Sequence, residues 1–442
     1  MNKVINQIGE TLVSLDEALF PIPTLAESWK TDVNKKTITF KLRERKFHDG
    51  SSLNSQDIFR SFIRSKNFKS GLTTDIIDFK RCRLKVKCPS FEIIDSRNIK
   101  LHLKNDNFSF FLRKLAGIEG VIFKAGPNGR FIGTGPYKIA SQTKNEVRLK
   151  RVSTNSYYDS IILKKISPHK GLSLFLDGEI DVIGNMTYRI QTEKIPAHYP
   201  YQDKIILTYG LVLGFRGIFK DREIRKAVSM GIDREAFMKA AGKNGFVAGG
   251  LIPKGFLGYQ TKKSAFDPEK AKKIIRSHLS PHSRTVIMVI SKGNGGIERF
   301  LKNSLNTIGL KLKIKHEIFK DALTRFRDNQ YDMMIKGDGP QFYESVTAFA
   351  PYISSQFMNV SKFSNPELDR LYQGYGALKT NAERLNALNK MEHILSKEVP
   401  FIPLFHPTFR VWNQPNIITN TKNKFSIKLW EFPYHQYGKL NY

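Results

Sequence analysis

The sequence Leu25-Ala-Glu-Ser-Trp29 is followed in turn by Thr37-Ile-Thr-Phe-Lys-Leu-Arg43, Phe47-His-Asp-Gly50 and Leu53-Asn-Ser-Gln-Asp57. In the second of these segments, Ile38, Phe40 and Leu42 alternate with polar residues. This period of two predicts a β-strand with one solvated face. The composition of 47–50 is typical of a turn, and Asn54 with Asp57 three residues later indicates a helix start. We therefore expect strand, turn and helix in this order.

The cysteines follow shortly afterwards and are the only two in the chain, Cys82 and Cys88. They stand in Cys-Arg-Leu-Lys-Val-Lys-Cys, where apolar and basic residues alternate as in a strand. On one extended strand their Cα atoms would lie about 20 Å apart. A disulfide requires about 7 Å or less. Pairing would need a bend that the alternation does not suggest, so the cysteines leave the redox compartment open. With 91–103, this region reads as a β-hairpin or meander.

The second half of the chain alternates strands and helices. A strand pattern at Thr285–Ile290, a helix pattern at Ile297–Thr307 and a strand pattern at Leu310–Ile314 predict a right-handed, parallel βαβ unit. Asp267-Pro268 and Asn365-Pro366 each place an N-cap before a proline at the first helical position. The second half should form an α/β lobe.

The composition indicates a folded protein with a large excess of positive charge. The chain has 442 residues, 40% of them hydrophobic, and a formal net charge of +32. The basic residues are interleaved with apolar ones, as in Leu310–His316, which favours solvated faces over a nucleic-acid interface. No run of eighteen apolar residues occurs, and the N-terminus lacks the apolar core of a signal peptide. We expect a monomer that binds no nucleic acid.

The motifs that carry chemistry are incomplete. His316-Glu317 begins like a zinc-binding His-Glu-x-x-His motif, but position 320 is Lys. His278 and His282 are separated by Ser280-Pro281, which interrupts a helix. Lys292-Gly-Asn-Gly-Gly296 lacks the Gly-Lys-Ser/Thr of a phosphate-binding loop, and Gly133-Thr-Gly-Pro-Tyr137 reads as a turn rather than a dinucleotide fingerprint. We therefore expect no enzyme activity, catalytic residue, metal site or cofactor.

The four opening segments closely resemble the signature of extracellular solute-binding protein family 5, which includes the oligopeptide-, dipeptide- and nickel-binding proteins of ABC importers. Further matches follow in order along nearly the whole chain: Gly133–Tyr137, Leu176–Asp181, Asp221–Ala227, Ile232–Glu235, Phe266–Ala271 and Val399–Leu404. The resemblance implies an α/β, two-lobed clamp of the periplasmic-binding-protein type (type II, large cluster), with an extra β-rich subdomain.

The resemblance also implies a division into domains. Lobe I is discontinuous and the lobes are joined by two crossover strands. The expected bounds are 1–25 plus 133–210 plus 406–442 for lobe I, 26–132 for the inserted β-rich subdomain and 211–405 for lobe II.

The function implied by the resemblance is solute binding without catalysis. Hinge closure would bury a peptide or similar small ligand between the lobes and present the closed surface to an ABC permease in the membrane. The implied location is periplasmic or extracytoplasmic.

The candidate ligand contacts lie just after a predicted strand at Tyr331–Ile335. Peptide-binding members carry a Gly-Trp-x-x-Asp-Tyr motif there, whose Asp pairs with the peptide's terminal ammonium. Here the stretch is Lys336-Gly-Asp-Gly-Pro-Gln-Phe-Tyr-Glu344, which places Gln341 at the Asp position. Gln accepts a hydrogen bond but carries no charge, which puts recognition of a free peptide amine in question. The candidate contacts are Asp338, Gln341, Phe342, Tyr343 and Glu344.

Two alternatives stay open. Only nine residues precede Glu10–Asp16, the segment similar to the start of the family's first lobe, so the N-terminus looks shortened. The chain could accordingly be a cytoplasmic ligand sensor built on the same clamp. The second alternative, a nucleic-acid-binding module, is supported only by the charge of +32. It predicts binding that weakens steeply as the salt concentration rises.

Overall fold

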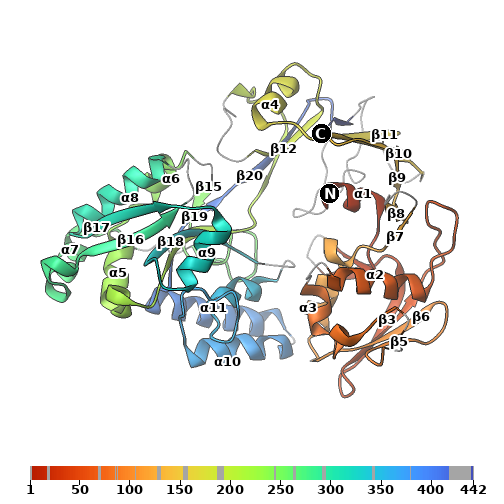
Figure 1. Ribbon diagram of the computed structural model, residues 1–442, viewed down its shortest axis with the longest axis horizontal. Coiled ribbons are helices and arrows are strands. Elements are labelled where there is room, and N and C mark those ends of the chain that lie inside the picture. Colours follow the sequence, from red (N-terminus) through yellow and green to blue (C-terminus); the bar gives the residue numbers. More distant parts are fainter. Residues whose placement is uncertain are drawn as a thin grey trace. The chain divides into compact units, whose positions relative to one another are not determined.

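The computed structural model describes residues 2–16, 20–67, 71–84, 86, 88–104, 106–126, 131–152, 158–186, 194–242, 245–261, 265–290, 295–340, 344–378, 380–417 and 440–441. The chain divides into two compact units (Figure 1). Unit 1 comprises Met1–Lys204 and Arg410–Tyr442, and unit 2 comprises Ile205–Phe409. The finer division of the chain into lobe I, an inserted subdomain and lobe II stays a prediction.

The first part of unit 1 is an antiparallel sheet with helices packed on it. The sheet has the order β3-β4-β6-β5, formed by Ala26–Asp32, Thr37–Leu42, Asn98–His102 and Phe91–Ile93. Ile38, Phe40 and Leu42 are fully buried, which confirms the strand and the face predicted from their alternation. The predicted helix is α2 (Ser55–Asn67), which buries Phe59 and Phe62 against the same core.

The prediction that Cys82 and Cys88 lie on one extended strand is wrong. A disulfide joins them, with their Cα atoms 5.1 Å apart. The chain leaves the short helix η2 (Phe79–Arg81) at Cys82, and Arg83 then faces Val86 across an isolated bridge. The amide of Val86 donates to the carbonyl of Arg83, which closes a tight turn. Alternation of apolar and basic residues occurs in such a turn as well as in a strand, and the turn brings the two sulfurs together.

The rest of unit 1 consists of short strands and helices. Gly133 and Gly135 pass so close to the backbone of Ile8 at the end of helix α1 (Asn2–Ile8) that a Cβ atom would clash with it. This close approach explains the glycines of Gly133–Tyr137 and agrees with the reading of that motif as a turn. The elements are β1 (Val13–Leu15), β2 (Pro21–Pro23), η1 (Gly71–Asp75), α3 (Phe108–Leu115), η3 (Ile118–Gly120), β7 (Phe123–Ala125), β8 (Phe131–Gly133), β9 (Tyr137–Gln142), β10 (Glu146–Arg151), β11 (Ser160–Lys164), α4 (Pro168–Leu176), β12 (Val182–Met186), β13 (Tyr201–Lys204), β20 (Phe409–Asn413) and β21 (Leu440–Asn441).

Unit 2 is built on one mixed sheet of the order β15-β19-β14-β18-β16-β17. Its strands are β14 (Thr208–Leu213), β15 (Gly245–Val247), β16 (Thr285–Ile290), β17 (Lys311–His316), β18 (Met333–Asp338) and β19 (Phe401–Pro407). Strands β16 and β17 run parallel with α8 (Gly295–Thr307) between them in the chain, which confirms the predicted order and parallel pairing of the βαβ unit. Strand β17 ends the sheet, and the exposed Lys311, Lys313 and Lys315 along it discourage pairing with another strand.

Two helices of unit 2 begin where the sequence predicts. Asp267 caps α7 (Pro268–His278) by accepting from the amide of Lys270, and Asn365 caps α10 (Pro366–Gly374) in the same way. Helix α11 (Asn381–Glu398) packs beside α10 (Figure 1). The remaining helices are η6 (Gly217–Lys220), α5 (Arg222–Met230), α6 (Arg234–Ala240), η7 (Pro281–Ser283), α9 (Phe319–Arg327), η8 (Ser345–Tyr352) and η9 (Tyr375–Ala377).

The two faces of the central strands differ in chemistry. One face is the apolar core, to which β14 contributes Leu211 and Leu213. On the other face, Thr208 lies opposite Asp338, and Gly210 lies opposite Lys336. Because side chains of a strand alternate between faces, these polar groups share one side of the sheet. We call this set the polar layer; it comprises Thr208, Lys336, Asp338, Tyr352, Glu392 and His406.

Candidate functional site

The structure describes two of the five predicted ligand contacts, Asp338 and Glu344. Asp338 is the last residue of β18, and Glu344 stands immediately before helix η8. Their side chains are buried, with 5% of each residue exposed. The other three, Gln341, Phe342 and Tyr343, lie outside the described residues.

Both oxygens of the Asp338 carboxylate are engaged. Lys336 Nζ lies 2.7 Å from Asp338 Oδ1, and Tyr352 Oη donates to Asp338 Oδ2 at 2.9 Å. Lys336 is itself buried, so both charges are removed from water and depend on each other. Burial, reinforced by the Asp338 charge, raises the pKa of Tyr352 well above its usual 10, which keeps this hydroxyl a donor.

Glu344 is held by a different tyrosine. Tyr375 Oη, from helix η9, donates to Glu344 Oε1 at 3.1 Å. The backbone carbonyl of Glu344 accepts from Thr347 Oγ1 at 2.6 Å, which anchors the first turn of η8. Asp338 and Glu344 are thus each a carboxylate that accepts from a tyrosine.

His406 adds a third buried group that sequence reasoning missed. Thr208 Oγ1 lies 2.6 Å from the carbonyl oxygen of Leu251 and 2.9 Å from His406 Nδ1. A carbonyl can only accept, so the hydroxyl proton points to Leu251 and Nδ1 of His406 carries the donor proton. Nε2 is then an acceptor, and it has no hydrogen-bond partner among the described residues. Tyr259 packs edge-on against the ring.

Burial lowers the pKa of His406 from 6.5 to about 4. A lowered histidine pKa contributes stability that is complete above the unfolded value of 6.5 and is lost as the pH falls toward 4. We expect the free energy of unfolding to drop by about 3 kcal/mol between about pH 7 and about pH 4 through this group. The H406F variant, followed by urea unfolding at both pH values, should lose less stability on acidification than the wild type.

The control for this prediction is H393Q, because His393 is exposed on helix α11. Its loss of stability between the two pH values should equal that of the wild type. If H406F and the wild type lost the same free energy of unfolding on acidification, the assignment of this acid sensitivity to His406 would be contradicted.

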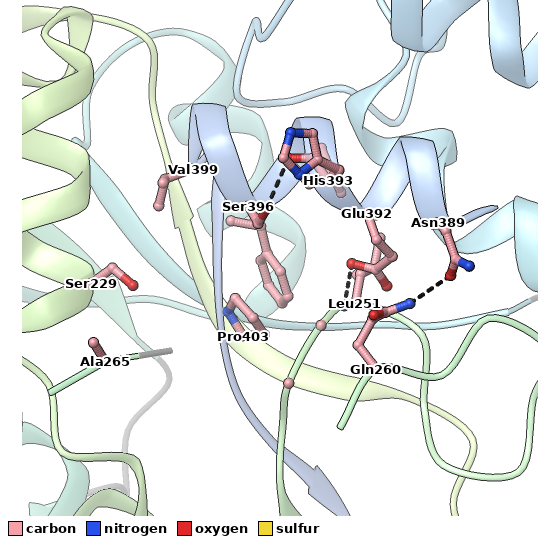
Figure 2. A pocket seen from close by; sticks show the side chains of 14 residues that line it. Ser229, Leu251, Gln260, Ala265, Asn389, Glu392, His393, Ser396, Val399 and Pro403 are labelled. Carbon is pink, nitrogen blue, oxygen red and sulfur yellow. Dashed lines mark hydrogen bonds between the residues drawn. The ribbon is translucent and has the colours of Figure 1, made fainter. Parts of the chain in front are cut away.

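Glu392 lines a cavity of about 440 Å³ between helix α11 and the segment before residue 261 (Figure 2). Its carboxylate accepts from the backbone amides of Leu251 at 3.1 Å and Ile252 at 2.8 Å. Asn389, one turn earlier, accepts from Gln260 at 2.8 Å. A side chain at position 250 would collide with the Glu392 carboxylate, which accounts for Gly250.

Burial raises the pKa of Glu392 from 4.5 to about 7, although the two backbone donors act in the opposite direction. The sequence carries a signal for this residue. The apolar residues Leu388, Met391 and Leu395 of helix α11 form a stripe that passes over position 392, where a glutamate is out of place unless it has buried partners. Its partners are 140 residues away or more, so spacing could not identify them.

The chemistry of the polar layer is that of hydrogen bonding and charge pairing. Within the described ranges, no group of three or more His, Cys, Asp or Glu residues is arranged to hold a metal ion. Among those same residues, no helix is long and apolar enough to cross a membrane.

The chain is similar to known solute-binding proteins over almost its full length. Residues 21–359 match the family model of bacterial extracellular solute-binding proteins, family 5 Middle. The periplasmic murein peptide-binding protein MppA of Escherichia coli is 22% identical, with 96% of this chain and 89% of that protein covered.

Solved structures agree with this similarity. HbpA2 from Haemophilus parasuis gives a TM-score of 0.82 at 20% identity and covers 98% of this chain and 95% of the other. NikA from Brucella suis, solved in complex with Fe(III)-EDTA, gives a TM-score of 0.80 at 19% identity. It covers 98% of this chain and 95% of the other. The mixed α/β fold predicted from the sequence is therefore confirmed. The family consists of binding proteins rather than enzymes, and this chain belongs to family 5 of the bacterial extracellular solute-binding proteins of ABC importers.

Proposed function

We propose that the chain captures a peptide or a similarly sized polar solute by hinge closure and delivers it to an ABC permease. The observation that carries the proposal is the family match, which includes the segment from Lys336 to Glu344. Asp338, Gln341, Phe342, Tyr343 and Glu344 are the proposed ligand contacts. Relatives support a peptide or a metal chelate, since MppA is named for murein peptide and NikA was solved with Fe(III)-EDTA.

The ligand proposed here does not depend on a free ammonium group. The Asp338 carboxylate already accepts from Tyr352 and pairs with Lys336, and Glu344 accepts from Tyr375. An incoming ammonium would have to compete with these partners for the same carboxylates. With a neutral glutamine at position 341, we expect peptides with a blocked N-terminus to bind about as well as free ones.

Thermal unfolding tests the ligand class. A solute present at about one hundred times its Kd stabilises the folded state by about 2.7 kcal/mol, which raises Tm by a few degrees. The panel comprises free peptides, the same peptides N-acetylated, and metal chelates. Equal shifts with free and acetylated peptides are the expected result. A shift confined to free peptides would contradict the proposed ligand class, and no shift with any solute would contradict capture itself.

The disulfide supports an extracytoplasmic location over the cytoplasmic sensor. Thiols in the cytosol are kept reduced, whereas disulfides persist in the periplasm or outside the cell. Curated relatives are named as periplasmic proteins. Trapping free thiols with a maleimide during lysis of the producing cells checks the location. We expect Cys82 and Cys88 to be unmodified until a reductant is added; two labelled thiols without reductant would favour the sensor.

A further inference from the structure

The end of helix η2 and the loop held by the disulfide, together called the cationic loop, carry positive charge and exposed apolar side chains. Lys80, Arg81 and Arg83 are exposed, and no acidic residue lies between Phe79 and Cys88. Leu84 is 52% exposed and Val86 is 59% exposed. The loop therefore presents two aliphatic side chains among cations.

The same loop is held in one conformation by bonds from its own neighbourhood. Lys66 Nζ, from helix α2, donates to the carbonyls of Lys80 at 3.2 Å and Cys82 at 2.9 Å. The guanidinium of Arg83 donates to the same two carbonyls at 2.7 and 2.9 Å. With the disulfide, these bonds keep the loop ordered before it meets a partner, which reduces the entropy lost on binding.

Positive charge is concentrated here rather than neutralised. No ion pair to a carboxylate is found for Lys66, Lys80, Arg81 or Arg83 within the described part of the chain. Partial burial and the neighbouring Arg83 lower the pKa of Lys66, as expected where cations crowd. A polyanionic surface would relieve this repulsion, so the loop fits a partner with a high density of negative charge.

We propose that the cationic loop, through its described residues 80–84 and 86, docks on the surface of an anionic phospholipid bilayer, with Leu84 and Val86 entering the headgroup region. Basic residues near an anionic leaflet are attracted to it, and aliphatic side chains gain by leaving water at the interface. A nucleic acid fits less well, because single strands are bound by stacking on exposed rings. The aromatic residue next to the loop, Phe79, is only 1% exposed.

Co-sedimentation of the full chain with vesicles tests the proposal. The probes are vesicles of phosphatidylcholine alone and vesicles containing about 30% phosphatidylglycerol, at about 0.1 M salt. The L84S/V86S variant leaves the net charge unchanged, and K80Q/R81Q removes two charged side chains for which no hydrogen bond or ion pair is found among the described residues. Each of these double variants should bind the anionic vesicles about tenfold more weakly than the wild type. The wild type should not bind vesicles of phosphatidylcholine alone.

Matched controls separate this loop from the charge of the whole chain. K138Q/K150Q also removes two charges, from exposed neighbours across strands β9 and β10 of unit 1. I22S/V33S replaces two exposed aliphatic residues of the same unit. Both should change binding by less than about twofold.

Three results would overturn the proposal. Equal losses in K80Q/R81Q and K138Q/K150Q would mean that the overall charge binds the vesicles. Unchanged binding in L84S/V86S would mean that the aliphatic side chains do not enter the lipid. Tighter binding to a single-stranded RNA oligonucleotide, lost in K80Q/R81Q, would assign the loop to nucleic acid instead. All substitutions are at exposed positions, and an unchanged Tm confirms that each variant is folded.

Discussion

Replacing Asp338 by asparagine is expected to lower the free energy of unfolding of unit 2 by about 3–5 kcal/mol. D338N keeps an oxygen that can accept from Tyr352, but it leaves the buried Lys336 ammonium without its carboxylate. A buried charge that loses its partner bears the full cost of its desolvation. Urea unfolding followed by far-UV circular dichroism measures the loss.

The matched control removes both charges. In K336M/D338N no unpaired charge remains, so this variant should lie within about 2 kcal/mol of the wild type although it carries one more substitution. Tryptophan fluorescence follows the unfolding of unit 1 separately, because Trp29, Trp412 and Trp430 all belong to unit 1 and unit 2 has no tryptophan. If the double variant is less stable than D338N alone, the charge pair is not the source of the effect.

Replacing Glu392 by alanine is expected to cost about 2–4 kcal/mol. The amides of Leu251 and Ile252 are buried and would lose the acceptor that now satisfies them. N389A, one turn earlier on the same helix, removes the contact of an exposed residue with Gln260 and should cost less than about 1 kcal/mol. Equal losses in E392A and N389A would show that the carboxylate does not hold the 251–252 segment.

The pH dependence of Glu392 has a definite sign. Its folded pKa of about 7 exceeds the usual 4.5, so its contribution to stability is complete below 4.5 and is lost as the pH rises toward 7. The loss amounts to about 3 kcal/mol. The conservative variant E392Q does not titrate, so its deficit relative to the wild type should be larger at about pH 5 than at about pH 8. A deficit that grows with pH would contradict the raised pKa.

His406 and Glu392 oppose each other between about pH 4.5 and 6.5, where acidification weakens the first contribution and strengthens the second. The wild type can therefore have a nearly flat stability in this range. Single substitutions should expose the opposing slopes, because each leaves the other group to titrate alone.

Local patterns in the sequence predicted local structure well. The alternation at Ile38, Phe40 and Leu42 located a strand and its buried face, and Asp267 and Asn365 located two helix starts. The βαβ unit could be predicted equally well, because its two strands are separated by a single helix. In each case the residues that determine the structure are close together in the chain.

The polar layer depends on contacts between distant residues and was not predicted as a unit. His406 meets Thr208 across 198 positions, and Glu392 meets Ile252 across 140. No periodicity links such pairs, so the sequence can mark a misplaced charge but cannot supply its partner. The prediction for the cysteines was wrong for a related reason: alternation describes a strand only while the chain stays extended, and a tight turn at Arg83–Val86 ends that extension.

Strands β14 and β19 are neighbours in the sheet of unit 2, and this has a consequence for how the coding sequence of the unit could be rearranged. The chain enters unit 2 just before Thr208 and leaves it just after Pro407, and these antiparallel strands pair, with Tyr209 opposite Phe405. The first and last strands of a segment of roughly two hundred residues thus pair antiparallel, with one irregularity between Tyr209 and Gly210. Residues 205–409 form a cassette that recombination could insert or remove without re-routing a strand, and whose ends a short linker could join for circular permutation.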